Sequence, residues 1–139
     1  MSWNEYITKL KEPEGDAVIR DAAIVGIEPA SVWASTPNMA NITAAEIKVL
    51  TSSDKSKLYS TGVTIAGMRC TLIRDQFADE PFTMDIKTKA TPTDSSTYNI
   101  TVAKSKQTLV IVMGAKDVHG GEPNKRAYNM ADYLRKSNY

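Results

Sequence analysis

The sequence predicts one domain of the α/β (α+β) class over residues 1–139, with a central antiparallel sheet and helices packed on its faces. Two observations lead to this prediction. Both ends of the chain have the apolar spacing of amphipathic helices, and residues 61–114 alternate with period two in five short segments. A chain of 139 residues, of which 42% are hydrophobic and 24% charged, can bury a core of its own without a metal or a disulfide.

The first helix is expected to begin at Ser2 and to end at residues 12–15, where the run Glu-Pro-Glu-Gly is typical of a helix end. Ser2 and Glu5 have the spacing of a capping box, in which each side chain accepts a hydrogen bond from the backbone N–H of the other residue. The apolar face has the i, i+3, i+4, i+7 spacing and consists of Trp3, Tyr6, Ile7 and Leu10.

Two short strands are expected after the first helix. Residues 22–27 are nearly all apolar, and a strand without polar alternation is buried on both faces, so we place it inside the sheet. Residues 31–35, with the sequence Ser-Val-Trp-Ala-Ser, follow after a short joint and predict a neighbouring strand.

A second helix is expected over residues 43–52. Thr43 and Glu46 repeat the capping-box spacing, and a helix start of this kind satisfies backbone N–H groups that have no partner within the helix. Ile42 and Ile47 flank the cap with the spacing of a hydrophobic staple. The two signals agree on where the helix begins.

Five consecutive strands are expected between Thr61 and Gly114. Joints rich in turn residues, such as Ala66–Gly67 and residues 79–81, separate the alternating segments. Short consecutive strands with tight joints pair as an antiparallel meander. The alternating apolar positions are Val63/Ile65, Cys70/Leu72, Phe82/Met84/Ile86, Tyr98/Ile100/Val102 and Leu109/Ile111/Met113.

The final helix is expected after Gly120, Gly121 and Pro123, and it completes a pattern in which Trp and Tyr residues stand at both ends of the chain. Two terminal helices that dock side by side would bring these rings together into a surface suited to a ligand. The alternative is that the rings simply pin both helices to the core. The apolar face of this helix consists of Ala127, Met130, Ala131 and Leu134.

Catalytic residues, metal sites and cofactors are not expected. His119 is the only histidine and Cys70 the only cysteine, which excludes zinc clusters, paired-histidine sites and an internal disulfide. No phosphate-binding or nucleophile-elbow glycine motif occurs. A nucleophile pair of Cys70 and His119 is the alternative that would make the chain an enzyme, although the apolar surroundings of Cys70 favour an inert buried thiol.

The net charge is only +1, but residues 104–139 carry seven Lys and Arg against three Asp and Glu, giving +4. This basic third suits an acidic partner, and it leaves an anionic-phospholipid or nucleic-acid binding module as an alternative function. The chain starts without a signal-peptide pattern, and no apolar run approaches the roughly 18 residues that a membrane span needs. With its single cysteine, we expect a cytoplasmic protein.

A set of segments runs in order along nearly the whole chain. It consists of W-N-x-Y-I at residues 3–7, DAAIVG at 21–26, SVWAS at 31–35, NITAAEIKVL at 41–50, CTLIRD at 70–75, MDIKTK at 84–89, YNITVAKSKQTLVIVMG at 98–114, VHGG at 118–121, NK at 124–125 and the terminal Y-x-MA-x-x-LR-x-S-x-Y. In these segments, with their order and spacing, the sequence resembles the profilin family, and the vertebrate type most closely.

The resemblance implies a central antiparallel sheet with the terminal helices together on one face and a further helix on the other. It implies a monomeric, non-enzymatic protein of the cytoplasm and cytoskeleton that binds monomeric actin and proline-rich proteins such as formins. Such a protein promotes nucleotide exchange on actin and delivers actin to filament elongation factors. No nucleic acid is implied as a partner.

The family's groove for proline-rich peptides corresponds to residues that the helical pattern already singles out. Position 133 is commonly His in the vertebrate type and is Tyr here, which keeps a flat ring and a hydrogen-bond donor. We therefore expect peptide binding with an altered peptide preference. The implied groove residues are Trp3, Tyr6, Trp33, Tyr133, Leu134 and Tyr139.

The family's actin-binding face corresponds to a second set of residues, in which Lys and Arg predominate among the charged members. Position 129, often Glu in the family, is Asn here, so no charged contact is expected there. The implied actin-binding residues are Tyr59, Arg69, Thr71, Arg74, Lys89, Asn99, Val118, His119, Gly121, Asn124, Lys125 and Tyr128.

Peripheral binding of phosphatidylinositol bisphosphate is also implied, through surface cations that attract anionic headgroups. The implied residues are Lys87, Lys89, Lys125, Arg135 and Lys136.

Overall fold

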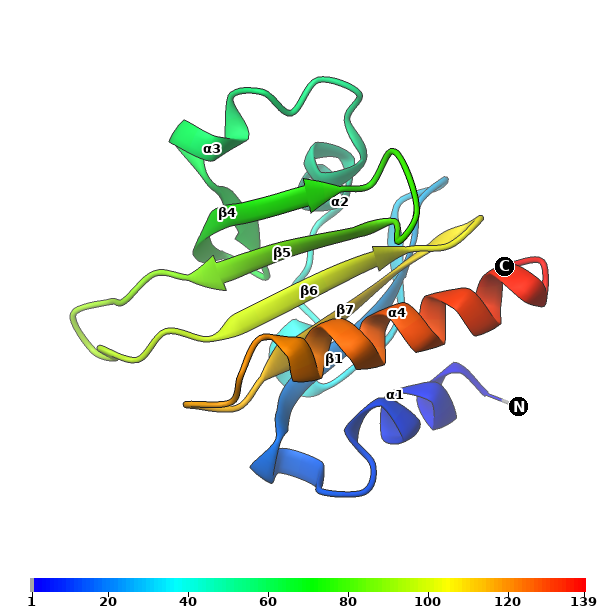
Figure 1. Ribbon diagram of the computed structural model, residues 1–139, viewed down its shortest axis with the longest axis horizontal. Helices are drawn as coiled ribbons and strands as arrows, with labels where there is room; N and C mark the ends of the chain where they lie inside the picture. Colours follow the sequence, from blue (N-terminus) through cyan, green and yellow to red (C-terminus); the bar gives the residue numbers. More distant parts are fainter. Residues whose placement is uncertain (1) are drawn as a thin grey trace.

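Seven antiparallel strands form one sheet in the order β2-β1-β7-β6-β5-β4-β3 in the computed structural model, which describes residues 2–139 (Figure 1). Among these residues, no helix is long and apolar enough to cross a bilayer. The strands are β1 (Ile19–Gly26), β2 (Ser31–Ser35), β3 (Val63–Ile65), β4 (Met68–Gln76), β5 (Thr83–Thr88), β6 (Asn99–Lys104) and β7 (Thr108–Gly114). The α-helices are α1 (Trp3–Lys11), α2 (Ala44–Thr51), α3 (Leu58–Thr61) and α4 (Gly121–Lys136), and 3₁₀ turns cover Gly15–Ala17 and Pro37–Met39.

The predicted meander is confirmed, because β3 to β7 pair consecutively and antiparallel. Strand β1 then pairs with β7 on one side and with β2 on the other, so it lies inside the sheet. This position explains its nearly uninterrupted apolar sequence, since both faces of β1 are covered.

Helices cover both faces of the sheet, as predicted. The terminal helices α1 and α4 lie side by side across one face (Figure 1). Their buried residues Ile7, Leu10, Ala127, Ala131 and Leu134 pack with the side chains of β1, β6 and β7 that point to this face. On the opposite face, α2 contributes to a second and larger apolar cluster. The sheet therefore separates two cores.

Of the two predicted capping boxes, the one at α2 is confirmed and the one at α1 is wrong. At α2, the Glu46 N–H donates to Thr43 Oγ1 (3.1 Å) and the Thr43 N–H donates to Glu46 Oε1 (2.9 Å). At α1, the Ser2 side chain makes no capping bond, and the Glu5 N–H donates to the Ser2 carbonyl instead. Ser2 and Glu5 are both exposed, so water can satisfy their polar groups without a reciprocal cap.

Helix α3 is an element that periodicity does not predict. It has one turn, and none of its four residues is buried, so no apolar stripe marks it in the sequence. Its Tyr59 is 56% exposed. The helix therefore contributes surface rather than core.

The buried carboxylate of Glu46 also ties α2 to the turn between β3 and β4. Its Oε1 accepts the Ala66 N–H (3.1 Å) and its Oε2 accepts the Gly67 N–H (2.9 Å), in a turn where both residues have positive φ. Burial alone would raise the pKa of Glu46, but the backbone donors of Gly67, Thr43 and Ala66 outweigh it and lower that pKa.

We expect Glu46→Gln to reduce the free energy of unfolding by about 2 kcal/mol at pH 7, because it removes a charged acceptor from three backbone donors. The stabilisation is present above pH ~4.3, the ordinary value for Glu, and is lost as the pH falls through the lower pKa of the folded protein. Urea unfolding of wild type and of Glu46→Gln at pH 7 and at pH 3 measures the difference in their free energy of unfolding at each pH.

Glu28→Gln is the matched control, because Glu28 is exposed and should change stability little. Equal stability of the Glu46 and Glu28 variants at pH 7 would contradict the role of the buried carboxylate.

Candidate functional site

Five aromatic side chains form one continuous surface, the aromatic groove, which consists of Trp3, Tyr6, Trp33, Tyr133 and Tyr139. The ring of Trp3 is central, with ring centroids 4.8 Å from Trp33, 5.2 Å from Tyr6 and 5.3 Å from Tyr139. Tyr6 continues the surface to Tyr133, at 6.0 Å. Trp3 and Tyr6 come from α1, Trp33 from β2 at the sheet edge, Tyr133 from α4 and Tyr139 from the residues after α4. The docking of α1 beside α4 therefore creates the groove.

The rings remain accessible because other residues attach the helices to the sheet. Tyr133 and Tyr139 are 51% and 44% exposed, and Trp3, Tyr6 and Trp33 are half-buried. Leu134, predicted as a groove residue, is fully buried and supports the groove from below. Part of every ring is thus accessible to a ligand, while Trp3, Tyr6 and Trp33 also pack against the core beneath them.

Two further features of the groove concern the protonation of Tyr6 and the packing of Trp33. Burial, and after it the neighbouring Tyr133 hydroxyl, raise the pKa of Tyr6, so Tyr6 stays a neutral donor at physiological pH. The Trp33 indole lies directly over Gly26 of β1, where an added Cβ would come within 2.6 Å of Nε1. Only glycine leaves room for Trp33 there, which sequence pattern alone did not reveal.

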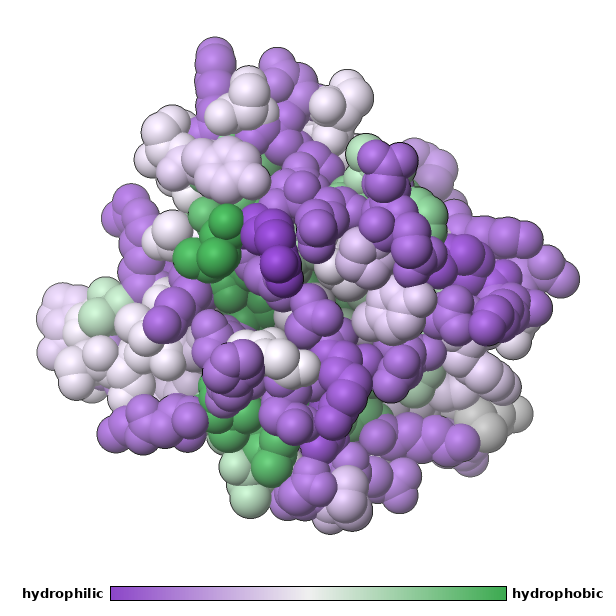
Figure 2. All heavy atoms as spheres, viewed as in Figure 1, coloured by the Kyte–Doolittle hydropathy of each residue, from purple (hydrophilic) through white to green (hydrophobic). Residues whose placement is uncertain are grey.

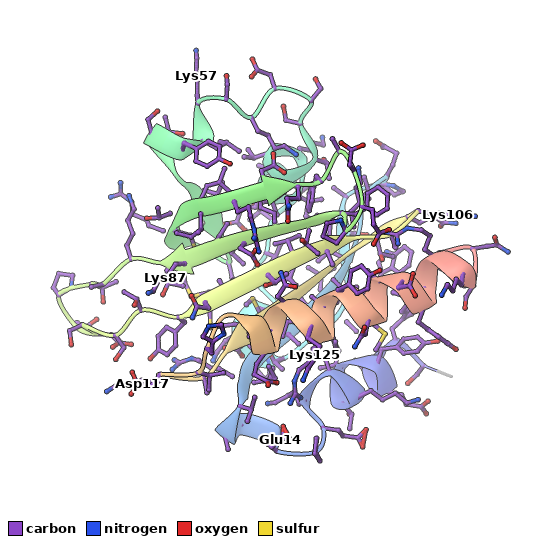
Figure 3. The ribbon with its side chains drawn as sticks, viewed as in Figure 1. Glu14, Lys57, Lys87, Lys106, Asp117 and Lys125 are labelled. Atoms are coloured by element: carbon purple, nitrogen blue, oxygen red, sulfur yellow. The ribbon has the colours of Figure 1, made fainter. Side chains whose placement is uncertain are left out.

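The last two residues are held by the turn between β6 and β7. The Ser105 hydroxyl donates to the backbone oxygen of Tyr139 (2.8 Å), and the Gln107 N–H donates to the same oxygen. The Gln107 amide donates to the Asn138 carbonyl (3.0 Å), and Lys106, at the tip of this turn beside the end of α4 (Figure 3), donates to the Asn138 side chain. These bonds place the Tyr139 ring against Trp3, and we call them the terminal tie.

A second surface, the polar face, surrounds Asp85 on β5. One carboxylate oxygen accepts bonds from Thr101 Oγ1 (2.8 Å) and from the Asn124 amide (2.9 Å), and the other accepts the Arg74 guanidinium at 2.8 and 3.2 Å. Asp85 thus links β4, β6 and α4. It was not among the predicted site residues, because an acidic residue on a strand has no distinctive sequence pattern.

The loop before α4 continues the polar face. The Asn99 amide donates to the Val118 carbonyl (3.2 Å), and the Gly121 N–H donates to Nδ1 of His119 (2.9 Å). The bond to Nδ1 means that the neutral His119 ring carries its proton on Nε2. A cavity of about 680 Å³ lies here, lined among others by predicted residues Arg74, Asn99, His119, Gly121 and Asn124.

Apolar side chains lie beside these polar groups. Ile73 on β4 lines the same cavity and is 56% exposed, although it was not predicted. Figure 2 shows a hydrophobic patch on this otherwise mainly hydrophilic face, over the region of β4 and β5. A single exposed isoleucine is ordinary, so Ile73 matters here only as apolar area next to the polar groups of the same cavity.

The other predicted actin-binding residues lie around this centre. Tyr59 projects from α3, Thr71 is half-buried on β4, and Arg69 and Lys89 line a smaller cavity of about 280 Å³. On α4, Lys125 is exposed, and the Tyr128 hydroxyl donates to Glu80 (2.7 Å), which raises the pKa of Tyr128. The structure thus brings one part of the predicted set into a single cavity and leaves the rest on its periphery.

The cations predicted to bind phospholipid do not form one patch. Lys87 and Lys125 lie on different elements (Figure 3), and Lys136 is at the far end of α4. On α4, Glu122 is 3.6 Å from Lys125, and Asp132 is 2.9 Å from Lys136 and 3.9 Å from Arg135. Arg135 also stacks on Phe82, 4.5 Å from the ring centroid.

The suggested nucleophile pair is not assembled. Cys70 is 1% exposed, and burial raises the pKa of its thiol to about 12, so almost no thiolate exists near neutrality. Cys70 lines the cavity beside β3, whereas His119 lines the cavity before α4. Among residues 2–139, no group of three or more His, Cys, Asp or Glu residues could hold a metal ion.

The family model for profilin matches residues 1–139 of this chain. The chain belongs to the profilin family. It is 45% identical over 141 residues to human Profilin-1, covering 99% of this chain and 98% of the relative. It is 41% identical to rat Profilin-2, with the same coverage.

Comparison with solved structures agrees with this assignment. Mouse profilin IIa in complex with a double repeat from the FH1 domain of mDia1 matches with a TM-score of 0.91 and 38% identity, covering 100% of both chains. The predicted vertebrate-type profilin fold is therefore confirmed. Profilins are regulatory binding proteins rather than enzymes, which excludes the catalytic alternative.

Proposed function

We propose that this profilin binds monomeric actin through the polar face and proline-rich segments through the aromatic groove. It would thereby deliver actin to filament elongation factors and promote nucleotide exchange on the bound actin. The single observation that carries the proposal is the presence of two accessible surfaces on one rigid sheet, built from different side chains. We place this activity in the cytoplasm and the actin cytoskeleton.

The chemistry of the aromatic groove supports a proline-rich ligand. A polyproline II helix presents apolar ring faces and unpaired carbonyl oxygens. Stacked Trp and Tyr faces accommodate the rings, while the indole N–H of Trp3 and the phenol O–H groups of Tyr6 and Tyr139 are donors for the carbonyls. The mouse relative solved with a double repeat from the FH1 domain of mDia1 supports the same assignment.

The polar face supports a protein partner with a mixed, predominantly acidic surface. Lys89 and the exposed Lys125 supply positive charge beside the Arg74–Asp85 ion pair, and Ile73 supplies apolar contact area. The Asp85 bonds hold Arg74 and Asn124 in place before a partner arrives, which reduces the entropy lost on binding. Nucleotide exchange then requires only that the bound partner be stabilised in its open state.

Phosphoinositide binding is the weaker part of the proposal, and nucleic-acid binding is disfavoured. Several cations of residues 104–139 already have acidic partners on α4 itself, where Glu122 pairs with Lys125 and Asp132 with Lys136. A lipid-binding cluster would therefore have to combine Lys87, Lys89 and Lys125, on the side of the molecule where α4 begins, with Arg135 and Lys136 at the far end of that helix. Exposed charges this dispersed bind anionic surfaces weakly and are sensitive to salt.

We expect Trp3→Ala and Tyr139→Ala to weaken binding of a proline decamer by about 2 kcal/mol or more, because each removes a wall of the aromatic groove. Titration followed by tryptophan fluorescence measures the peptide affinity of wild type and of Tyr139→Ala, since both proteins keep Trp3 and Trp33 in the groove. Calorimetry serves for Trp3→Ala. The control is Tyr59→Ala, which removes an exposed tyrosine from α3. Unchanged affinity in both groove variants would exclude this site.

We expect Lys125→Glu and His119→Glu to weaken actin binding by about 2 to 5 kcal/mol where the contact is desolvated, because they place negative charge against an acidic partner. Both variants should keep wild-type affinity for the proline decamer, and Trp3→Ala should show the reverse. Fluorescence titration of labelled monomeric actin measures the first affinity, and circular dichroism checks folding.

Lys48→Glu is the matched control for this experiment, since Lys48 is exposed on α2 at the opposite face of the sheet. Wild-type actin affinity in both polar-face variants would show that actin binds elsewhere. A parallel loss of both affinities in every variant would show that the two surfaces are not independent.

A further inference from the structure

The aromatic groove is a series of facing side chains along two helices. Trp3 of α1 lies against Tyr139, and one helical turn further Tyr6 lies against Tyr133 of α4. The numbers rise along α1 and fall along α4, so the helices run in opposite directions, side by side (Figure 1). Residues three or four apart share one helical face. The next facing positions are therefore 9 and 10 on α1 and 129 and 130 on α4.

A cavity of about 300 Å³ lies at these next positions. It shares Tyr6 and Tyr133 with the aromatic groove, and Lys9, Asn129 and Met130 form further walls. The cavity is therefore a continuation of the groove beyond its last aromatic pair, and we call it the flanking subsite.

The charge of the flanking subsite has one sign. Lys9 and Arg126 are the only charged residues that line it, and both are positive. Arg126 is already engaged, since it donates to the Leu10 carbonyl (3.1 Å) and pairs with Glu14. Lys9 is exposed, and within residues 2–139 no carboxylate lies within ion-pair distance of its ammonium group. The Lys9 charge is thus available to a ligand.

A peptide in the groove would reach the flanking subsite within two residues. Three residues of α-helix advance about 4.5 Å along the axis, and a polyproline II chain advances about 3.1 Å per residue. One or two residues beyond the proline that packs on Tyr6 and Tyr133 therefore span the distance to Lys9 and Asn129.

We propose that the flanking subsite binds an acidic side chain, Asp or Glu, one or two residues outside the proline tract. This proposal rests on the function proposed above. The carboxylate pairs with the Lys9 ammonium and accepts from the Asn129 amide, while its methylene stem packs on Met130. The aromatic groove then supplies most of the affinity, and the flanking subsite selects among proline-rich segments by the charge of their neighbouring residues.

The test compares proline decamers that carry a Glu, a Lys or no extra residue at each end, measured by calorimetry at low salt. We expect the Glu peptide to bind wild type about fivefold more tightly than the Lys peptide at one of the two ends, as for a partly exposed ion pair. Lys9→Glu should reverse the preference, and Lys48→Glu should keep it. In 1 M NaCl the preference should fall below twofold, since the screening length is then about 3 Å.

The unflanked decamer separates the two proposals. If it fails to bind wild type, the groove is not a proline site and the proposed function is wrong. If it binds, but Glu and Lys peptides bind equally at both ends, or if Lys9→Glu keeps the wild-type preference, the flanking subsite is wrong and the groove assignment stands.

Discussion

Hydrogen bonds from the β6–β7 turn to the backbone oxygens of Asn138 and Tyr139 hold these residues in place, and the aromatic groove depends on this tie. Chain ends are ordinarily the least ordered part of a domain. Here the Tyr139 ring is fixed against Trp3 from the other end of the sequence. The aromatic rings can stay accessible, because the buried residues Ile7, Leu10, Ala131 and Leu134 attach the two helices to the sheet underneath them.

Helix α4 connects the two proposed binding surfaces. Asn124 lies near its start and bonds to Asp85 on the polar face, and Tyr133 lies near its end in the aromatic groove. Nine residues of helix separate them by about 14 Å along the axis. Because the helix and the sheet are packed as one body, a partner on each surface can be accommodated without a change in the other.

Much of the fold could be predicted from the sequence, because its signals are local. Period-two alternation marked the meander, and Thr43 with Glu46 marked the start of α2. The same spacing at Ser2 and Glu5 led to a wrong prediction of a capping box, since water can satisfy the polar groups of an exposed helix end. Helix α3 shows no apolar pattern in the sequence because none of its four residues is buried.

The site was predictable only in part. The aromatic residues drew attention by their positions at both ends of the chain. Asp85, Gly26 and Ser105 did not, because each acts through a contact that only the fold creates. Asp85 bonds to Asn124 and Ser105 to Tyr139, both far along the chain, and Gly26 packs under Trp33 of the neighbouring strand. Contacts of this kind depend on the three-dimensional arrangement, which periodicity and composition do not specify.

The most direct test of the terminal tie is the affinity of Ser105→Ala for a proline decamer, with Ser53→Ala as the exposed control. Removing the Ser105 hydroxyl deletes its bond to the Tyr139 backbone oxygen and also the bond that it accepts from the Thr108 N–H (3.1 Å), so urea unfolding must accompany the titration. We expect severalfold weaker peptide binding by a protein that still folds and keeps its actin affinity. Wild-type peptide affinity in a folded Ser105→Ala protein would show that the groove does not depend on the tie.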